Sequence, residues 1–393
     1  MSDLHRPLRI LWATPAYWPA IAFGGPTWMA KELTEGLARL GHEVRVVTTS
    51  LRAVGEPPAA RWQSRTRDVG GVTVEYLATP VRYRWMGVTP TLPLSLVRGR
   101  PPDIVHVFGY RDVVTTAAAA WARVRRTPYV FEPLNMFVPR FRNVPLKRSF
   151  DAVVGRPVAR GATLVVANSR HERAQLVGAG LDPDRVVTRP NGFPPPRDPA
   201  APTGALRHRL GLGADVPLVL NVGRLSFKKG LDLLLKAVAP LPGAHVALLG
   251  PDDGDGTLGR LQALRDELGL GGRVHFLGPS DERGPGDAYA DADVFVLPSR
   301  EESFGMVAAE AAASGTAVVV TDRCGVAEVL EDRAAVVVPC AVEPIRDAVR
   351  TLLGDPALRR RLGEAGRAVA REVSWEAVVR RQEEIYRLAL RRT

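Results

Sequence analysis

Cysteine is nearly absent from this chain, which has only Cys324 and Cys340 among its 393 residues. Two cysteines 16 positions apart, with no further metal-ligating pair beside them, indicate neither a disulfide framework nor a zinc site. This usage fits the reducing cytoplasm, where we expect the protein to work.

Long apolar runs are missing as well. The longer apolar regions, such as residues 307–320, contain a charge or fall short of the roughly 18 residues that a membrane span requires. The apolar stretch at residues 8–13 is too short for the core of a secretory signal. No repeat of roughly 20–50 residues is present, which argues against a solenoid. We therefore expect a globular protein that does not cross a bilayer.

Positive charge is concentrated in the first half of the chain. Residues 1–190 contain 27 Lys and Arg against 14 Asp and Glu, whereas residues 191–393 contain 26 against 28. A basic half suits a nucleic acid, an anionic membrane surface or a phosphate-bearing acceptor, and it also fits arginine spread over solvated faces. Few aromatic residues lie in the basic segment, which disfavours nucleic acid but is compatible with peripheral contact at the inner membrane face. The basic residues of this segment are Arg140, Arg142, Lys147, Arg148, Arg156 and Arg160.

Short β-branched runs alternate with helical patterns along the whole chain. This alternation predicts an α/β fold with parallel sheets and crossover helices in both halves. The first half predicts strands at residues 9–12, 44–48, 72–76, 104–107, 129–131 and 164–167, with a helix at 26–40. The second half predicts strands at residues 218–222, 245–249, 274–277, 294–297, 317–320 and 335–338.

Length and turn chemistry predict two domains. A chain of 393 residues exceeds one ordinary core at roughly 150 residues per domain. The densest turn-forming segment, residues 189–199, falls near the middle, so we place the boundary between residues 190 and 191. Beyond residue 342 only helical patterns remain, and the last one, residues 375–390, has the apolar spacing of an amphipathic helix. The expected parts are residues 1–190, 191–374 and 375–393.

The segment VGRLSFKKG at residues 222–230 lies between a predicted strand and a predicted helix. Ligands of open α/β sheets bind beyond the carboxyl ends of the strands, which places Arg224 and Lys229 beside a binding site. A forked guanidinium and a compact ammonium together suit a diphosphate. The alternative is a solvated loop with basic tips.

The segment PSREESFGMVAAE at residues 298–310 also reads as strand, loop and helix. Glu302 and Glu310 are eight positions apart, a little over two helical turns, so both can project to one side. The backbone amides around residues 304–306 open the helix and favour a phosphate. The alternatives are a capping carboxylate for Glu302 and a polar helix face for Glu310, although Glu310 stands among alanines typical of a buried face.

Together these segments resemble the retaining glycosyltransferases of family 4, and the likeness extends over nearly the whole chain. Further matching segments follow in the same order, namely Gly24-Gly25, residues 41–44, residues 103–106, Asn191-Gly192 and the final helix from Trp375. The resemblance implies the GT-B fold, with two Rossmann-like domains facing across a cleft. The N-terminal domain would lie on the acceptor side, the C-terminal domain would bind the donor, and the final helix would cross back to the N-terminal domain.

The resemblance also implies the reaction and its residues. A hexose-type sugar would pass, with retention, from a nucleoside diphosphate sugar such as a UDP or GDP sugar to a hydroxyl of a sugar, lipid-linked or small-molecule acceptor. Arg224 and Lys229 would contact the diphosphate, Glu302 the sugar hydroxyls and Glu310 the ribose. The implied donor set is Gly24, Gly25, Gly223, Arg224, Lys229, His275, Leu277, Glu302, Ser303, Phe304, Gly305, Met306 and Glu310. We expect the catalytic residues to be Arg224, Lys229, Glu302 and His106.

The chain departs from the family pattern on the acceptor side. Many members carry a His after the strand that corresponds to residues 129–131, whereas this chain has Glu132, and Asn135 follows three positions later. Glu132, Asn135 or His106 could take the vacated role, although a lone His at a strand end is also a common structural residue. The Asp pairs at residues 253–255 and 291–293 look like metal sites, but basic residues already serve the diphosphate, so we expect no metal or other cofactor.

Two rival interpretations stay open at this stage. A nucleotide-sugar epimerase of similar two-domain build would convert the donor without an acceptor. A non-catalytic, basic, membrane-binding protein would use only the charge of the first half.

Overall fold

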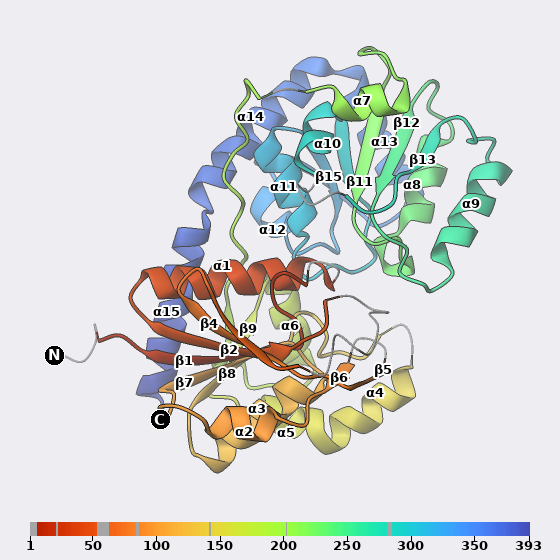
Figure 1. Cartoon of the computed structure of the whole chain (residues 1–393). Coiled ribbons are helices and arrows are strands. Elements are labelled where there is room, and N and C mark those ends of the chain that lie inside the picture. Colours follow the sequence, from red (N-terminus) through yellow and green to blue (C-terminus); the bar gives the residue numbers. More distant parts are fainter. Residues whose placement is uncertain are drawn as a thin grey trace. The chain divides into compact units, whose positions relative to one another are not determined.

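The computed structural model describes residues 6–20, 23–52, 63–83, 86–140, 143–201, 203–280 and 285–393. The chain forms two compact units (Figure 1). Unit 1 is Met1–Pro190 together with Trp375–Thr393, and unit 2 is Asn191–Ser374. The boundary after Pro190 lies in the turn-forming segment, and the boundary before Trp375 lies at the start of the final helix.

Unit 1 contains an eight-stranded sheet in the order β10-β9-β8-β7-β1-β2-β4-β3. All neighbours are parallel except β3, which runs antiparallel to β4 at the edge. The central strands β1 and β7 are buried and almost continuously apolar, as parallel strands covered on both faces should be. The strands are β1 (Arg9–Ala13), β2 (Glu43–Thr49), β3 (Arg65–Val69), β4 (Val72–Leu77), β7 (Ile104–Phe108), β8 (Tyr129–Glu132), β9 (Leu164–Ala167) and β10 (Val186–Thr188).

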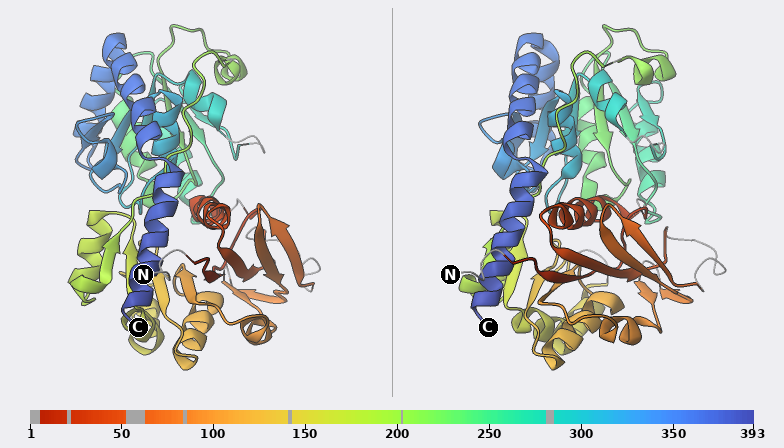
Figure 2. Two further views of the ribbon diagram at one scale, coloured as in Figure 1. Left: turned by 90° about the vertical axis from the view of Figure 1, so that its left-hand side faces the viewer. Right: turned by 60° about the vertical axis from the view of Figure 1, so that its left-hand side comes forward.

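Helices cover both faces of this sheet, with α1 on one face and α2, α3 and α5 on the other (Figures 1 and 2). The helices are α1 (Gly25–Arg39), α2 (Leu92–Val97), α3 (Val113–Val124), α4 (Val144–Phe150), α5 (Arg156–Gly161) and α6 (Arg170–Gly178), with a π-helical segment at Asp151–Gly155. A short hairpin, β5 (Val81–Tyr83) and β6 (Met86–Val88), stands apart from the sheet.

The last helix, α15 (Trp375–Arg391), packs in unit 1 against α1 and β8, as expected. The side chains predicted to form its apolar face are buried: Trp375, Val378, Val379, Ile385, Tyr386 and Ala389. The approach to α1 is close, because a Cβ on Gly36 would meet a methyl carbon of Val379 at 2.3 Å. Small residues allow two helices to approach in this way.

Unit 2 contains a six-stranded, fully parallel sheet in the order β13-β12-β11-β14-β15-β16. Its strands are β11 (Leu218–Val222), β12 (His245–Leu249), β13 (Val274–Phe276), β14 (Val294–Leu297), β15 (Ala317–Thr321) and β16 (Ala335–Val338). Its helices are α7 (Ala205–Leu210), α8 (Leu231–Val238), α9 (Thr257–Glu267), α10 (Gly286–Asp291), α11 (Met306–Ser314), α12 (Ala327–Leu330), α13 (Val342–Gly354) and α14 (Pro356–Glu372).

The predicted α/β class is confirmed, and each predicted strand is present to within two residues at either end. The strands that the sequence analysis missed are β3, β5, β6 and β10. Strand β3 reads RTRDV and is exposed or half-buried throughout, so it has no apolar alternation to reveal it.

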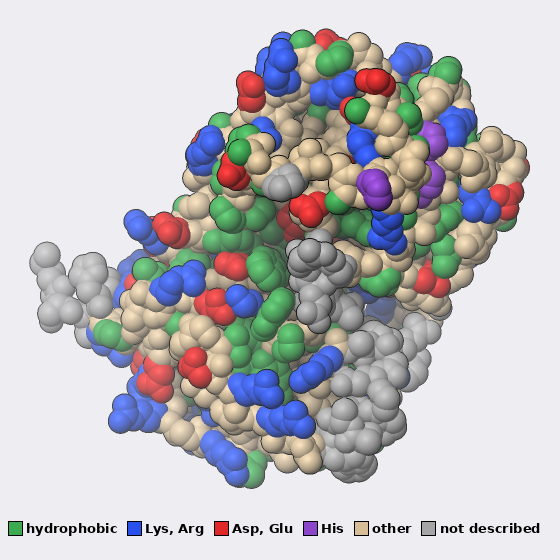
Figure 3. Space-filling model, turned by 45° about the horizontal axis from the view of Figure 1, so that its top comes forward, with side chains coloured by type: hydrophobic (Ala, Val, Ile, Leu, Met, Phe, Trp, Pro, Cys, Tyr) green, Lys and Arg blue, Asp and Glu red, His purple; other side chains and the backbone are tan. Residues whose placement is uncertain are grey.

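On the face shown in Figure 3, Lys and Arg side chains are spread among acidic and apolar ones.

Candidate functional site

The sheet of unit 2 has a topological switch point between β11 and β14. Strands β12 and β13 lie on one side of β11, and β14, β15 and β16 lie on the other. Loops that leave the carboxyl ends of the strands at such a point diverge, and α/β proteins bind ligands between them. The two loops here are residues 223–230 after β11 and residues 298–305 after β14, which are the two segments singled out from the sequence.

The two loops are bound to each other through their backbones. Gly230 has a φ of 66°, and a Cβ on it would meet the carbonyl oxygen of Pro298 at 2.1 Å. The amide of Arg300 donates a hydrogen bond to the carbonyl of Lys228 at 2.8 Å. The guanidinium of Arg300 also donates to both carboxylate oxygens of Asp232, at 2.8 and 2.7 Å. The functional side chains of both loops therefore emerge at one place.

Lys229 and Glu302 meet at this place. The Lys229 Nζ atom lies 2.5 Å from Glu302 Oε2, and the two side chains are only 13% and 18% exposed. Burial acts to raise the pKa of Glu302, but the charge of Lys229 and of neighbouring basic residues outweighs it and holds the pKa below its ordinary value. Arg224 is one of these neighbours. The carboxylate is therefore ionised and surrounded by cations.

Arg224 reaches outward from the same loop. Its Nη1 atom donates to Asp253 Oδ1 at 3.0 Å, and the side chain is 43% exposed. Gly223, one position earlier, lies beside the end of Lys229, whose Cε would be 3.5 Å from a Cβ placed on the glycine. The loop thus presents one sheltered ammonium and one accessible guanidinium.

Helix α11 starts directly after the second loop. Gly305 precedes it with a φ of 102°, and no side chain caps this end of the helix. Phe304 anchors the loop, since it is 2% exposed and packs edge to face against Phe193. The Ser303 hydroxyl is buried and has no hydrogen-bond partner within the described ranges. The amides of Met306 and Val307, at the positive end of the helix dipole, are in position to bind an anion, whereas the amide of Ala308 donates to the carbonyl of Gly305.

Glu310 lies one turn further along α11, among the buried alanines that the sequence predicts. Its Oε2 atom accepts a hydrogen bond from the hydroxyl of Tyr289 at 2.7 Å. Burial raises the pKa of Glu310 to about 7, with the Tyr289 hydroxyl acting in the opposite direction. This carboxyl group is therefore held in a fixed orientation and changes charge near neutral pH.

The family resemblance implies that β13, with His275 and Leu277, passes the nucleobase of the donor, and this strand is an edge strand of the sheet. The ring of His275 stacks on that of His245, with Nε2 and Nδ1 3.0 Å apart. The amide of Leu277 donates to the carbonyl of Leu248, so this amide is used within the sheet. A contact of His275 or Leu277 with a base stays a prediction.

Gly24 and Gly25 belong to unit 1, where α1 begins. Gly24 has a φ of 86°, which favours glycine, and among the described residues beyond its chain neighbours no atom lies within 4 Å of a Cβ placed on it. The start of the helix is thus open, as a backbone seat for a ligand should be. A contact of these two glycines with the donor stays a prediction.

The catalytic prediction for His106 requires correction. His106 is fully buried on β7, with its Nδ1 atom 2.8 Å from the Tyr386 hydroxyl and its Nε2 atom 3.3 Å from Glu132 Oε2. Glu132 is equally buried and accepts a hydrogen bond from Arg189 at 2.7 Å. Burial lowers the pKa of His106, which favours the neutral ring. His106 and Glu132 therefore help to hold α15 in unit 1 and cannot touch a substrate in this arrangement.

The aspartate pairs have structural partners. Asp291 accepts hydrogen bonds from the amides of Gly204 and Leu206, and Asp293 accepts from Arg207 and from the amide of Leu218. In the described part of the chain, no group of three or more His, Cys, Asp and Glu side chains could hold a metal ion.

Three features of the site were not found by sequence reasoning. They are the hydroxyl of Tyr289 on Glu310, the buried hydroxyl of Ser303, and the pairing of Arg300 with Asp232. Each depends on a contact between segments far apart in the chain or on burial, for which a single sequence carries no periodic signal.

Two Rossmann-like units, with a basic and acidic cluster at the switch point of the second, have the architecture of a glycosyltransferase of the GT-B type. Comparison with known proteins gives the family. Residues 24–192 match the family described as "Glycosyl transferase 4-like domain", and residues 204–369 match "Glycosyl transferases group 1". The chain belongs to this group, the family 4 glycosyltransferases, so the predicted family, fold and enzyme class are confirmed.

The chain is similar to full-length relatives. It is 32% identical over 394 aligned residues to a D-inositol 3-phosphate glycosyltransferase of Xylanimonas cellulosilytica, covering 94% of this chain and 93% of the relative. It is 33% identical over 415 aligned residues to D-inositol 3-phosphate glycosyltransferase 2 of Catenulispora acidiphila, covering 98% and 96%. The fold resembles sucrose-phosphate synthase from Thermosynechococcus elongatus, with a TM-score of 0.76, 23% identity and coverage of 98% and 99%. Within the described ranges, every helix is too short or too polar to span a membrane.

Proposed function

We propose that this glycosyltransferase moves a hexose-type sugar from a nucleoside diphosphate sugar to a hydroxyl group, with retention of the anomeric configuration. The observation that carries the proposal is the convergence of Lys229, Glu302 and Arg224 with the start of α11 at the switch point of unit 2. The family of the chain supports retention.

The cations would act on the leaving group. As the glycosidic bond breaks, negative charge grows on the departing diphosphate, and this charge separation forms most of the barrier. Lys229 is held by Glu302, and the first amides of α11 are held by the helix, so these groups need little reorganisation when the charge develops. Groups of this kind are typically worth about 3–4 kcal/mol each.

The carboxylates would position the sugar and the ribose. Glu302 is ionised and therefore accepts hydrogen bonds from sugar hydroxyls, while its contact with Lys229 keeps it aligned. Glu310 would accept from the ribose hydroxyls when it is ionised, with Tyr289 fixing its orientation. An oxygen of the departing diphosphate would take the proton of the acceptor hydroxyl, so no carboxylate is needed as the general base.

We further propose that no metal ion takes part in the reaction. Arg224 and Lys229 supply the positive charge that a metal would bring to the diphosphate. Turnover in the presence and absence of a chelator tests this, and a loss of activity that magnesium restores would contradict it.

The acceptor class follows from the relatives. Two relatives of nearly full coverage carry the name D-inositol 3-phosphate glycosyltransferase. We therefore propose a phosphorylated polyol as the acceptor, rather than an unphosphorylated sugar.

A thermal-shift screen with nucleoside diphosphates tests the donor part of this proposal. A ligand at 100 times its dissociation constant adds about 2.7 kcal/mol to the free energy of unfolding. Product analysis with and without acceptor then separates transfer from epimerisation. A sugar nucleotide converted equally well without an acceptor would favour the epimerase and contradict transfer.

A peripheral membrane contact is a second candidate function. Leu146 and Val153 are 64% and 75% exposed. Arg148 and Arg156 lie near them in the sequence, as do Lys147 and Arg160, whereas Arg142 lies outside the described residues. Exposed apolar side chains beside cations suit an anionic bilayer. Sedimentation with anionic vesicles tests the contact, and the absence of salt-sensitive binding would contradict it.

A further inference from the structure

Arg224 is paired with a carboxylate of the neighbouring loop. Its Nη1 atom donates to Asp253 Oδ1 at 3.0 Å, and the two side chains are 43% and 31% exposed. Asp253 belongs to the first of the two aspartate pairs noted in the sequence, and the site described above gives it no role. An ion pair as exposed as this one adds little to stability, so stability alone does not explain why Asp253 stands beside a residue predicted to bind the donor.

The backbone sets the place of Asp253 beside Arg224. The loops after β11 and β12 continue to pair beyond the ends of these neighbouring strands. The amide of Leu225 donates to the carbonyl of Pro251 at 2.9 Å, and the amide of Asp253 donates back to the carbonyl of Leu225 at 3.3 Å. Leu225 also forms a parallel bridge with Asp252 and is itself buried. The two side chains therefore meet because strand order brings their backbones together.

Further contacts attach the loop after β12 to the donor loop, residues 223–230. At one end, a Cβ on Gly250 would meet the carbonyl oxygen of Gly223 at 1.9 Å, so the two backbones touch where they leave the sheet. At the other end, Asp255 accepts a hydrogen bond from the amide of Phe227 at 3.4 Å. The loop is thus attached to the donor loop on both sides of its acidic turn.

The contact leaves much of the guanidinium available for a ligand. Asp253 accepts one hydrogen bond, from Nη1 of Arg224, and a guanidinium has further N–H donors arranged to bind two phosphate oxygens in a fork. Lys229, the second cation predicted to contact the diphosphate, has its Nζ atom 2.5 Å from Glu302 Oε2. Each of the two cations is thus paired with a carboxylate from a neighbouring loop.

We propose that Asp253 is a positioning residue of the donor site, which holds the guanidinium of Arg224 where the leaving diphosphate develops its charge. This inference rests on the proposed function, because it takes Arg224 to contact the diphosphate. A long side chain loses rotational freedom when it binds a ligand, and a partner that already restricts the side chain removes part of that cost. Charge that is oriented in advance then stabilises the transition state without reorganisation.

The test uses the full chain and a panel of UDP- and GDP-linked hexoses, with D-inositol 3-phosphate as the acceptor. The donor with the fastest release of nucleoside diphosphate is then used to measure kcat and KM. Asp253→Ala should lower kcat/KM about tenfold, because Arg224 must then give up the freedom of a long side chain to reach the leaving group. Most of the loss should fall on kcat, since the charge that Arg224 stabilises develops only as the glycosidic bond breaks.

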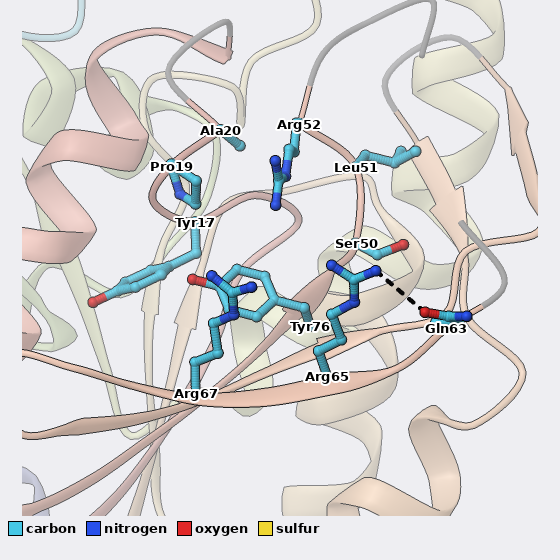
Figure 4. Close-up of a pocket in the computed structure, with 10 residues that line it drawn as sticks. All are labelled: Tyr17, Pro19, Ala20, Ser50, Leu51, Arg52, Gln63, Arg65, Arg67 and Tyr76. Carbon is cyan, nitrogen blue, oxygen red and sulfur yellow. Dashed lines mark hydrogen bonds between the residues drawn. The ribbon is translucent and has the colours of Figure 1, made fainter. Parts of the chain in front are cut away.

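The variant Asp253→Asn separates orientation from charge. An amide oxygen can accept from a guanidinium as a carboxylate does. In unit 1, Gln63 Oε1 accepts from Nη2 of Arg65 at 3.2 Å, as the dashed line in Figure 4 shows. Asp253→Asn keeps such an acceptor and removes the charge, so its kcat/KM should stay within about threefold of that of the unsubstituted protein.

A double variant shows whether Asp253 acts through Arg224. In protein that already carries Arg224→Ala, the substitution Asp253→Ala should have no further effect on kcat/KM. A full tenfold loss in that background would overturn the assignment, because the loop would then matter for its structure alone. Asp266→Ala is the matched control, since it removes an exposed aspartate of the same unit that pairs with Arg265 at 2.7 Å. It should leave kcat/KM unchanged.

Two other results would overturn the positioning role and leave the proposed function standing. One is equal kcat/KM in Asp253→Ala and Asp266→Ala. The other is a rise of kcat/KM in both Asp253→Ala and Asp253→Asn, because Asp253 would then compete with the diphosphate for Arg224. Absence of turnover by the unsubstituted protein with every donor of the panel would instead contradict the proposed function.

Discussion

Replacement of Lys229 by alanine should lower the turnover number about 100-fold or more. The Lys229 side chain is 13% exposed, and its Nζ atom lies 2.5 Å from Glu302 Oε2. Its removal takes away one preorganised charge from the leaving diphosphate, which is typically worth about 10²–10³ in turnover. It also leaves the sheltered carboxylate of Glu302 without its closest cation, so the incoming diphosphate meets a negative charge.

The assay is the release of nucleoside diphosphate from the donor identified in the thermal-shift screen. Lys236→Ala is the matched control, because it removes an exposed lysine on α8 of the same unit. The double variant Lys229→Ala/Glu302→Gln separates the two effects. If the unpaired carboxylate repels the donor, removing its charge should restore part of the donor binding.

Turnover of Lys229→Ala close to that of Lys236→Ala would refute the donor-site reasoning. Strict additivity of the Lys229 and Glu302 substitutions would refute their coupling, since contacting charges should show an interaction energy of about 0.5–3 kcal/mol. A thermal unfolding curve for each variant shows whether the fold is intact.

Three further predictions concern stability and pH. Gly230→Ala should lower the free energy of unfolding about 1–3 kcal/mol more than its control Gly243→Ala, as measured by denaturant titration. Both glycines have a similar positive φ, so the backbone strain is matched, but only Gly230 faces a backbone oxygen. Arg189→Met should cost about 3–5 kcal/mol in the same assay, since it leaves Glu132 buried without its cation. Donor affinity should rise between about pH 6 and 8 as Glu310 ionises, and Glu310→Gln should remove this dependence in a pH series of donor titrations.

Each of these three predictions has a control or an outcome that would contradict it. Equal losses in the two glycine variants would contradict the close contact of the loops at Pro298. Arg185→Ala is the control for Arg189→Met, because it removes a half-exposed arginine of the same unit. It should change the free energy of unfolding by less than about 0.5 kcal/mol. A pH profile of donor affinity that is the same in Glu310→Gln would show that another group titrates.

Much of the fold was predictable because parallel sheets need buried, β-branched strands on a regular spacing. The strands of unit 2 could be located from such runs, as in the apolar stretch that forms β14. Turn residues after Arg189 located the division of the chain. Strand β3 was missed because an edge strand can be polar on both faces and is held by backbone hydrogen bonds to β4 alone.

The site was predictable only where chemistry is local in the sequence. Both loops could be identified because each follows a strand. The first carries Arg224 and Lys229, which suit a diphosphate, and the second carries Glu302 and leads into the start of a helix. Their contact with each other was not visible, because it depends on the order β11-β14 in the sheet, although 73 residues separate Lys229 from Glu302.

By itself, the sequence predicted the α/β class, the division into two domains and the two loops whose residue types suit a charged ligand, because these follow from local composition and spacing. Only the tertiary structure decided which of those residues meet. It buried His106 against Tyr386 on α15, and it brought Lys229 against Glu302. The physical reason is that burial and strand order are set by the packing of the whole unit, which no single segment encodes.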